Sequence, residues 1–259
     1  MHKNSNNPTS WQSSGRWYDT IVGKKGHHYH QTIIIPKSLK LLAIENSSKS
    51  ALLDLACGQG VLSRHLPNQT IYTGLDAAKD LIRSADQYKH PKNHEFIHAD
   101  VTKELHLKKQ DYTHASIILA LQNIQEPVKV FKNAHSHLCS QGKFLIILNH
   151  PCFRIPRQSS WQIDPNTKIR YRRMDCYMSS MQIPIQTHPS QGKNSPTTWS
   201  FHHPLSQYFA WLNETGFSIL NVEEWCSDKT SEGKGIAAKM ENKSRQEIPL
   251  FMAILASKK

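Results

Sequence analysis

The stretch ALLDLACGQGVLSRHL, residues 51–66, decides the fold. A short apolar run leads into Gly58 and Gly60, in a chain that has only 11 glycines among 259 residues. Glycine lets the main chain turn tightly, and it lets a ligand approach without meeting a Cβ atom. A strand, a glycine-rich turn and a helix are together typical of sites for nucleotide-like ligands. We therefore expect a buried strand over residues 51–56 and a ligand-binding turn after it.

The spacing of the glycines limits the kind of ligand. A dinucleotide fingerprint needs a third glycine where Ser63 stands, and a P-loop needs a Lys followed by Ser or Thr, which this turn lacks. The turn thus favours neither a pyrophosphate nor a triphosphate. Taken alone, it does not identify its ligand.

Apolar runs typical of strands recur along the chain, and amphipathic segments separate several of them. The further predicted strands cover residues 70–75, 95–99, 113–121, 143–149, 217–225 and 248–255. The predicted helices cover residues 77–88, 127–139 and 203–215. This alternation predicts an α/β fold with a parallel sheet that is covered on both faces. Residues 227–246 are polar, and we expect a loop or a poorly ordered arm there.

Acidic residues follow the second and third predicted strands. Asp76 can accept hydrogen bonds from the two hydroxyls of a ribose, and Asp100 from an exocyclic amine such as that of adenine. Because the carboxyl ends of parallel strands meet at one edge of a sheet, we expect both carboxylates beside the glycine turn. The alternative is that each acid only caps a turn or a helix.

Three motifs in this order, LLDLACGQG (52–60), YTGLD (72–76) and HADV (98–101), resemble the class I S-adenosylmethionine-dependent methyltransferases. The resemblance runs from about residue 32 to the end of the chain, and SQGK (140–143) matches the turn before the family's fifth strand. It implies a Rossmann-like, seven-stranded, mostly parallel sheet with helices on both faces, an antiparallel last strand and an inserted substrate cap after the fifth strand. The implied cofactor is S-adenosylmethionine.

The resemblance also implies which residues contact the cofactor. Asp54 and Gly58 would lie near its methionine part, Gly60 would allow close approach, Asp76 would hold the ribose, and Asp100 would meet the adenine. Neighbouring positions complete the expected contacts, and these are Ala56, Ala77, Val101 and Leu119. Cys57 matches a position that the family fills with a small residue or Cys, so we expect it to pack rather than to react.

The N-terminal segment RWYDTIVGKKGHHYH, residues 16–30, resembles the corresponding segment of the branch that acts on small molecules, such as quinone precursors. In that branch a helix folds over the cofactor, which makes Tyr18 and Tyr29 candidates for contacts to the methionine end. A surface helix with aromatic anchors is the alternative. We expect residues 1–15 to be a disordered tail and residues 16–259 to form a single domain.

The regular pattern breaks over residues 151–200, which we predict to be the substrate cap. Between residues 152 and 175, six Arg or Lys stand against two Asp, and alternation over 169–177 predicts a β-ribbon. Arginines there can hold a carboxylate or a phosphate. The candidate substrate-binding residues are Asn123, Asn149, Arg154, Arg172 and Trp199. A solvated arm that pairs with a second copy is the alternative.

A general base is needed only if the acceptor must lose a proton. His150 follows the fifth predicted strand and is the candidate catalytic residue, with a structural turn residue as the alternative.

Composition restricts the partners and the setting. The net charge of +12 favours an anionic partner, such as nucleic acid, an anionic membrane surface or an acidic substrate, although a basic surface serving only solubility remains an alternative. Five scattered cysteines without CxxC spacing argue against a disulfide framework or a zinc site, so we expect no metal and a cytoplasmic location. We expect no secretory signal and no membrane-spanning run.

Two classes of function follow. The first is methyl transfer to a small-molecule acceptor at carbon or oxygen, with peripheral contact to an anionic membrane that carries a lipophilic acceptor. The second is methyl transfer to RNA or protein, with the basic, aromatic-rich insertion gripping the macromolecule. A non-catalytic subunit with this fold is a third hypothesis, against which the intact glycines and acids argue. The oligomeric state is left open.

Overall fold

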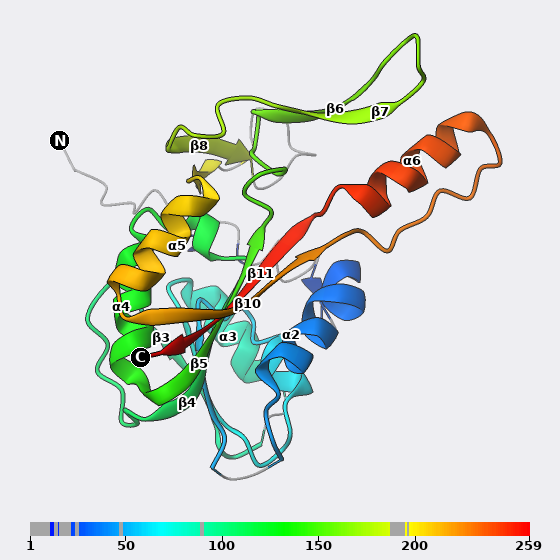
Figure 1. Ribbon diagram of the computed structural model, residues 1–259. Helices are drawn as coiled ribbons and strands as arrows, with labels where there is room; N and C mark the ends of the chain where they lie inside the picture. Colours follow the sequence, from blue (N-terminus) through cyan, green and yellow to red (C-terminus); the bar gives the residue numbers. More distant parts are fainter. Residues whose placement is uncertain are drawn as a thin grey trace.

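Seven strands form one sheet in the order β10-β11-β5-β4-β1-β2-β3, as the computed structural model shows (Figure 1). The structure describes residues 11, 12, 15, 22, 23, 26–46, 49–88, 91–186, 195 and 197–259. The strands of this sheet are β1 (Ala51–Leu55), β2 (Ile71–Asp76), β3 (His94–His98), β4 (Tyr112–Ile118), β5 (Leu138–Asn149), β10 (Phe217–Trp225) and β11 (Phe251–Lys258). β11 runs antiparallel to both of its neighbours, β10 and β5, and the other neighbouring strands pair in parallel. The predicted sheet, with its antiparallel last strand, is confirmed.

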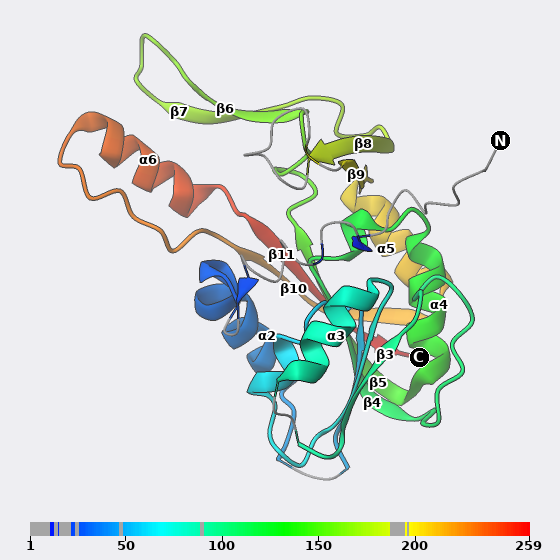
Figure 2. The ribbon, with the colours of Figure 1, turned by 180° about the vertical axis from the view of Figure 1, so that it is seen from behind.

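Helices cover both faces of the sheet (Figures 1 and 2). One face carries α2 (Ile35–Leu42), preceded by the π-helical turn η2 (His30–Ile34), and α3 (Lys79–Gln87). The other face carries α4 (Pro127–His137) and α5 (Leu205–Glu214). Side chains alternate along β1, so Leu53 packs in the core on the α4 side while Leu52 packs in the core on the α2 side. Two separate apolar cores therefore fix the sheet from both sides.

Several elements differ from their predicted form. The glycine turn leads only into a short 3₁₀ helix, η3 (Leu62–His65), because Leu66 is extended, as residues before proline commonly are, and Pro67 follows. Strand β5 begins directly where α4 ends, and β11 lies three residues later than expected. The predicted loop at 227–246 is wrong in its second half, where α6 (Ile236–Glu247) forms. The Ala, Lys, Met, Glu and Gln residues there favour a helix without an apolar stripe.

The insertion after β5 contains two hairpins rather than one ribbon. The first pairs β6 (Ser159–Ile163) with β7 (Arg170–Met174), and the second pairs β8 (Met181–Gln186) with β9 (Thr197–His202). The β6–β7 hairpin and α6 project side by side from the body of the molecule (Figures 1 and 2), and an Arg170–Glu241 ion pair of 3.3 Å joins them. No helix in the described part of the chain is long and apolar enough to cross a membrane.

Candidate functional site

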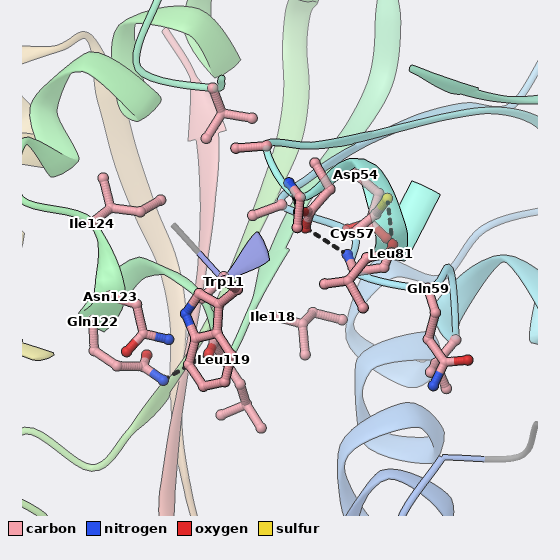
Figure 3. Close-up of a pocket in the computed structure, with 18 of the residues that line it drawn as sticks. Trp11, Asp54, Cys57, Gln59, Leu81, Ile118, Leu119, Gln122, Asn123 and Ile124 are labelled. Carbon is pink, nitrogen blue, oxygen red and sulfur yellow. Dashed lines mark hydrogen bonds between the residues drawn. The ribbon is translucent and has the colours of Figure 1, made fainter. Parts of the chain in front are cut away.

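A cavity of about 1110 Å³ opens at the carboxyl ends of the parallel strands (Figure 3). Nine of the predicted cofactor residues line it, namely Tyr29, Asp54, Ala56, Gly58, Asp76, Ala77, Asp100, Val101 and Leu119. They come from the N-terminal segment and from the ends of β1, β2, β3 and β4. The topology thus brings together residues that are far apart in the sequence. Tyr18 lies outside the described residues.

Asp76 ties the glycine turn to the end of β2. One of its carboxylate oxygens accepts a hydrogen bond from the Gly58 amide at 2.9 Å, and the other accepts from the Ala78 amide at 2.8 Å. Gly58 has a φ of 58°, in the left-handed region that glycine tolerates without strain. Burial raises the pKa of Asp76, and each oxygen keeps further capacity to accept a hydrogen bond. Asp76 can therefore receive ligand hydroxyls while it holds the turn.

Gly60 has a different role from the one predicted. It lies outside the cavity lining, and a Cβ atom there would lie 2.5 Å from Cε1 of Phe96 on β3. Its φ of 70° is also left-handed. Gly60 is therefore needed for packing of the turn against the Phe96 ring, rather than for clearance toward a ligand.

Asp54 is the buried centre of a hydrogen-bonded group beneath the cavity. The Tyr72 hydroxyl donates to one of its oxygens at 2.8 Å, and the Ser116 hydroxyl donates to the other at 2.7 Å. Burial raises the pKa of Asp54 to about 6, and the nearby Asp76 acts in the same direction. Burial also raises the pKa of the Cys57 thiol, which makes this thiol a poor nucleophile. Tyr72 and Ser116 were not predicted from the sequence, although polar residues inside apolar strands are a usable signal.

Asp100 lines the cavity beyond β3. Its Oδ1 accepts hydrogen bonds from the Thr102 amide at 2.9 Å and the Thr102 hydroxyl at 2.7 Å. Among the described residues these are the hydrogen bonds of its carboxylate, so Oδ2 is available to a ligand donor such as an exocyclic amine. Asp100 thus caps a turn and faces the cavity at once, which joins the two interpretations that the sequence left open.

Besides Arg154, three side chains of the cavity lining have a buried polar atom without a hydrogen-bond partner in the described part of the chain. These atoms are His30 Nδ1, Gln59 Oε1 and Gln122 Oε1. Burial lowers the pKa of His30 to about 3, so its imidazole is neutral at physiological pH. Buried polar atoms are nearly always satisfied, and a polar ligand such as an amino acid would satisfy these. None of the three was predicted, although His30 ends the quoted GHHYH segment and Gln59 stands between the two glycines.

The far end of the cavity holds three of the five predicted substrate-binding residues: Asn123, Asn149 and Arg154. Arg172 and Trp199 lie outside the lining. The Arg172 guanidinium donates to the Phe153 carbonyl at 2.9 Å and to the Ser159 hydroxyl at 2.7 Å. Its role is to hold the base of the β6–β7 hairpin. Trp11, from the segment predicted to be a disordered tail, lines the cavity instead (Figure 3).

His150 does not fit the role of a general base. Its side chain is 1% exposed and lies outside the cavity lining. Nε2 lies 2.6 Å from Oε1 of Glu224, and Nδ1 accepts a hydrogen bond from the Cys152 amide at 3.2 Å. Both ring nitrogens are therefore used, and burial lowers the pKa of the imidazole. His150 joins the end of β5 to β10, which is the structural role that the sequence had left as the alternative.

Comparison with known proteins identifies a recognised domain that supplies part of the cavity lining. Residues 53–146 match the family described as "Methyltransferase domain". A solved S-adenosylmethionine-dependent methyltransferase from Mesorhizobium loti is 25% identical, with a TM-score of 0.66 over 85% of this chain and 96% of that one. A Listeria monocytogenes structure, described as a putative enzyme of the same class, is 20% identical, with a TM-score of 0.68 over 87% and 96%.

A more distant structure contains the methyl donor. The glycopeptide N-methyltransferase MtfA, solved with S-adenosylmethionine, is 15% identical to this chain, with a TM-score of 0.53 over the full length of both. At this identity the likeness concerns the fold alone. No curated protein matches the chain.

Proposed function

We propose that this enzyme methylates a small molecule. Residues 53–146 are a methyltransferase domain, in a chain with the fold of the class I S-adenosylmethionine-dependent methyltransferases. The reaction class and the cofactor, S-adenosylmethionine, follow from the domain and the fold, as the sequence predicted. The class of the acceptor is the proposal, and it rests on the shape and lining of the cavity.

The size and the lining of the cavity carry this proposal. Its volume of about 1110 Å³ exceeds the ~300–1,000 Å³ typical of a site for one small ligand, so it has room for a cofactor and a second small molecule. Two residues of the insertion, Arg154 and Ile185, contribute to the wall beyond β5. The insertion therefore supplies part of the wall at the far end of the cavity, which we call the acceptor end and which also contains Asn123 and Asn149, and this supports an acceptor of small-molecule size.

The residues of the chain bind the cofactor and the acceptor, orient them toward each other, and exclude water. The sulfonium of the bound cofactor supplies an already activated methyl group. Asp76 and Asp100, which line the cavity, would hold the nucleoside end of the cofactor, and Asp54, fixed by the Ser116 hydroxyl, would lie near its methionine end. Such positioning is the main requirement of an in-line displacement, in which the reacting atoms approach within ~3–3.5 Å. At the acceptor end, the side-chain amides of Asn123 and Asn149 can orient an acceptor atom.

The competing hypothesis, methylation of RNA or protein, relied on free arginines in the β6–β7 hairpin. Arg170 pairs with Glu241 at 3.3 Å, Arg173 pairs with Asp175, and Arg172 donates to Phe153 and Ser159. Each of these arginines therefore already has an internal partner. Among the four cations of the hairpin, only Lys168 in its exposed loop has no ion pair and no side-chain hydrogen bond with the described residues, so the hairpin offers a single free cation to a phosphate backbone.

Binding and transfer experiments test the proposal. Calorimetry should detect S-adenosylhomocysteine binding to the parent and to Asp86→Ala, an exposed control on α3, and a loss of binding for Asp76→Ala. With labelled S-adenosylmethionine and cell extract, we expect label in the small-molecule or lipid fraction. Label confined to RNA or protein would overturn the acceptor class. Absence of binding in the parent would overturn the use of this cofactor by the cavity.

A further inference from the structure

Arg154 places a positive charge without a counter-ion at the acceptor end of the cavity. Its guanidinium is partly buried in the lining, and its Nε is buried without an acceptor. Within the described ranges Arg154 makes no ion pair and no side-chain hydrogen bond. It lies five residues after the end of β5, in a turn where its amide donates to the His150 carbonyl at 2.8 Å, so the position of its main chain is fixed.

The surroundings of Arg154 add positive charge rather than compensating it. The guanidinium groups of Arg154, Arg170 and Arg172 lie 5.8, 4.5 and 5.3 Å from the centre of the Trp161 ring. Arg170 has Glu241 as a partner, and Arg172 has the Phe153 carbonyl, whereas Arg154 has only the ring among the described residues. Burial, followed by the charge of Arg172, lowers the pKa of Arg154 to about 10, so it stays protonated at neutral pH.

A guanidinium in this position is satisfied best by an oxyanion. Removing a charge from water costs free energy unless a partner of opposite charge and hydrogen bonds replace the water. Carboxylate and phosphate oxygens match the planar fork of arginine and bind it through two parallel hydrogen bonds. Ile185, Leu250 and Phe251 line the same cavity with apolar surface. The lining therefore suits a molecule with an apolar body and one anionic group.

We propose that the methyl acceptor is an amphipathic small molecule whose carboxylate or phosphate group is bound by Arg154, while a different atom of it receives the methyl. This inference rests on the proposed function, because it requires that a small-molecule acceptor occupies this end of the cavity. The anionic group then belongs to the acceptor and not to the cofactor. It assigns Arg154 as a substrate-binding residue. The Trp161 ring, 5.8 Å from the guanidinium, stabilises that group by a cation–π contact.

The test observes the Arg154 side chain directly. The protein is labelled with ¹⁵N at arginine Nε, saturated with S-adenosylhomocysteine, and titrated with benzoate, phenyl phosphate and neutral benzamide as probes. The Arg154 signal is the one missing in Arg154→Lys. We expect it to shift with one of the two anions and not with benzamide, and the anion that acts distinguishes a carboxylate from a phosphate. Arg154→Gln should weaken binding of that anion at least ~10-fold, while exposed Arg157→Gln should leave it unchanged.

Two outcomes would overturn the inference, and a third would overturn the proposed function instead. If neither anion moves the Arg154 signal, the acceptor end is not an anion site. If Arg154→Gln weakens S-adenosylhomocysteine binding ~10-fold or more, Arg154 holds the carboxylate of the cofactor. If the parent does not bind S-adenosylhomocysteine at all, the cavity is not a cofactor site, and this is measured before any anion is added.

Discussion

The two ends of the cavity differ in whether their charged side chains have hydrogen-bond partners within the chain. At the cofactor end, Asp54 and Asp76 each receive two hydrogen bonds from within the chain. At the acceptor end, Arg154 lines the cavity with a buried Nε that has no acceptor in the described part of the chain. The two carboxylates at the cofactor end are therefore satisfied during folding, whereas we propose that a ligand satisfies Arg154 at the acceptor end. Substitutions at the first end should reduce folding stability, and substitutions at the second should reduce binding only.

The largest expected effect is at Gly60, on the cofactor side. Gly60→Ala places a residue with a Cβ atom in the left-handed region, which costs about 1–2 kcal/mol of stability. The added methyl group also overpacks the Phe96 ring, which costs about 1–3 kcal/mol. We expect the free energy of unfolding to fall by about 2–5 kcal/mol, the sum of these two costs, as measured by urea denaturation. Gly235→Ala is the matched control, because its φ is −74° and nothing lies near its Cβ position. Equal stability of the two variants would show that the turn is not built around Gly60.

Asp54 makes the stability of the cofactor end depend on pH. Burial raises its folded-state pKa to about 6, above the ordinary 3.8, so the folded protein takes up this proton more readily than the unfolded chain. The resulting stabilisation is complete below about pH 4 and is lost as the pH rises through about 6. Asp54→Asn cannot titrate. Relative to this variant, the parent should lose up to about 3 kcal/mol between about pH 4 and 7.

Urea denaturation of parent and variant at about pH 4.5, 5.5 and 7 spans this window and measures the difference. Asp86→Asn, an exposed aspartate on α3, is the control and should parallel the parent. If the stability difference between the parent and the Asp54→Asn variant is constant with pH, Asp54 titrates normally, and the buried group beneath the cavity is not as dry as the structure indicates.

His150 tests where the catalytic machinery ends. Because both ring nitrogens are engaged and the side chain lies outside the lining, His150→Gln should lower kcat by less than ~10-fold and leave the pH profile in place. A general base is worth ~10²–10⁴-fold, and its loss removes the acid limb of the profile. Glu224→Gln keeps the shape of the hydrogen-bond partner and should behave like His150→Gln. If the pH profile loses its acid limb in His150→Gln but not in Glu224→Gln, His150 is the general base.

The cofactor end was predictable from the sequence because its residues follow strands that can each be recognised from a local apolar run. Apolar runs located the ends of β1, β2 and β3, and parallel pairing then put Asp54, Asp76 and Asp100 at one edge. The role of Gly60 was not predictable in this way. Its φ and its distance to Phe96 depend on how β3 packs over the turn, and neither is visible in local sequence.

The acceptor end was predicted less well because its residues lie in irregular segments. Asn123, Asn149 and Arg154 lie at or shortly after the ends of β4 and β5, so the strand ends positioned them correctly. Arg172 and Trp199 lie within hairpins of the insertion, where the direction of a side chain depends on which hairpin packs on which loop. Helix α6 was missed because its polar sequence has helix propensity but no apolar face.

The smallest expected effect concerns the attachment of the projecting hairpin to α6. Glu241 pairs with Arg170 of β7 and with Arg245 of its own helix, and these side chains are partly exposed. Surface ion pairs contribute little to global stability, so Glu241→Gln should leave the urea midpoint unchanged while amide exchange speeds up in β6 and β7 but not in β5. Glu247→Gln, exposed at the end of α6, is the control. If exchange in the hairpin is unchanged, its position is set by the contacts at its base, Arg172 with Phe153 and Ser159, and the acceptor end is as firmly built as the cofactor end.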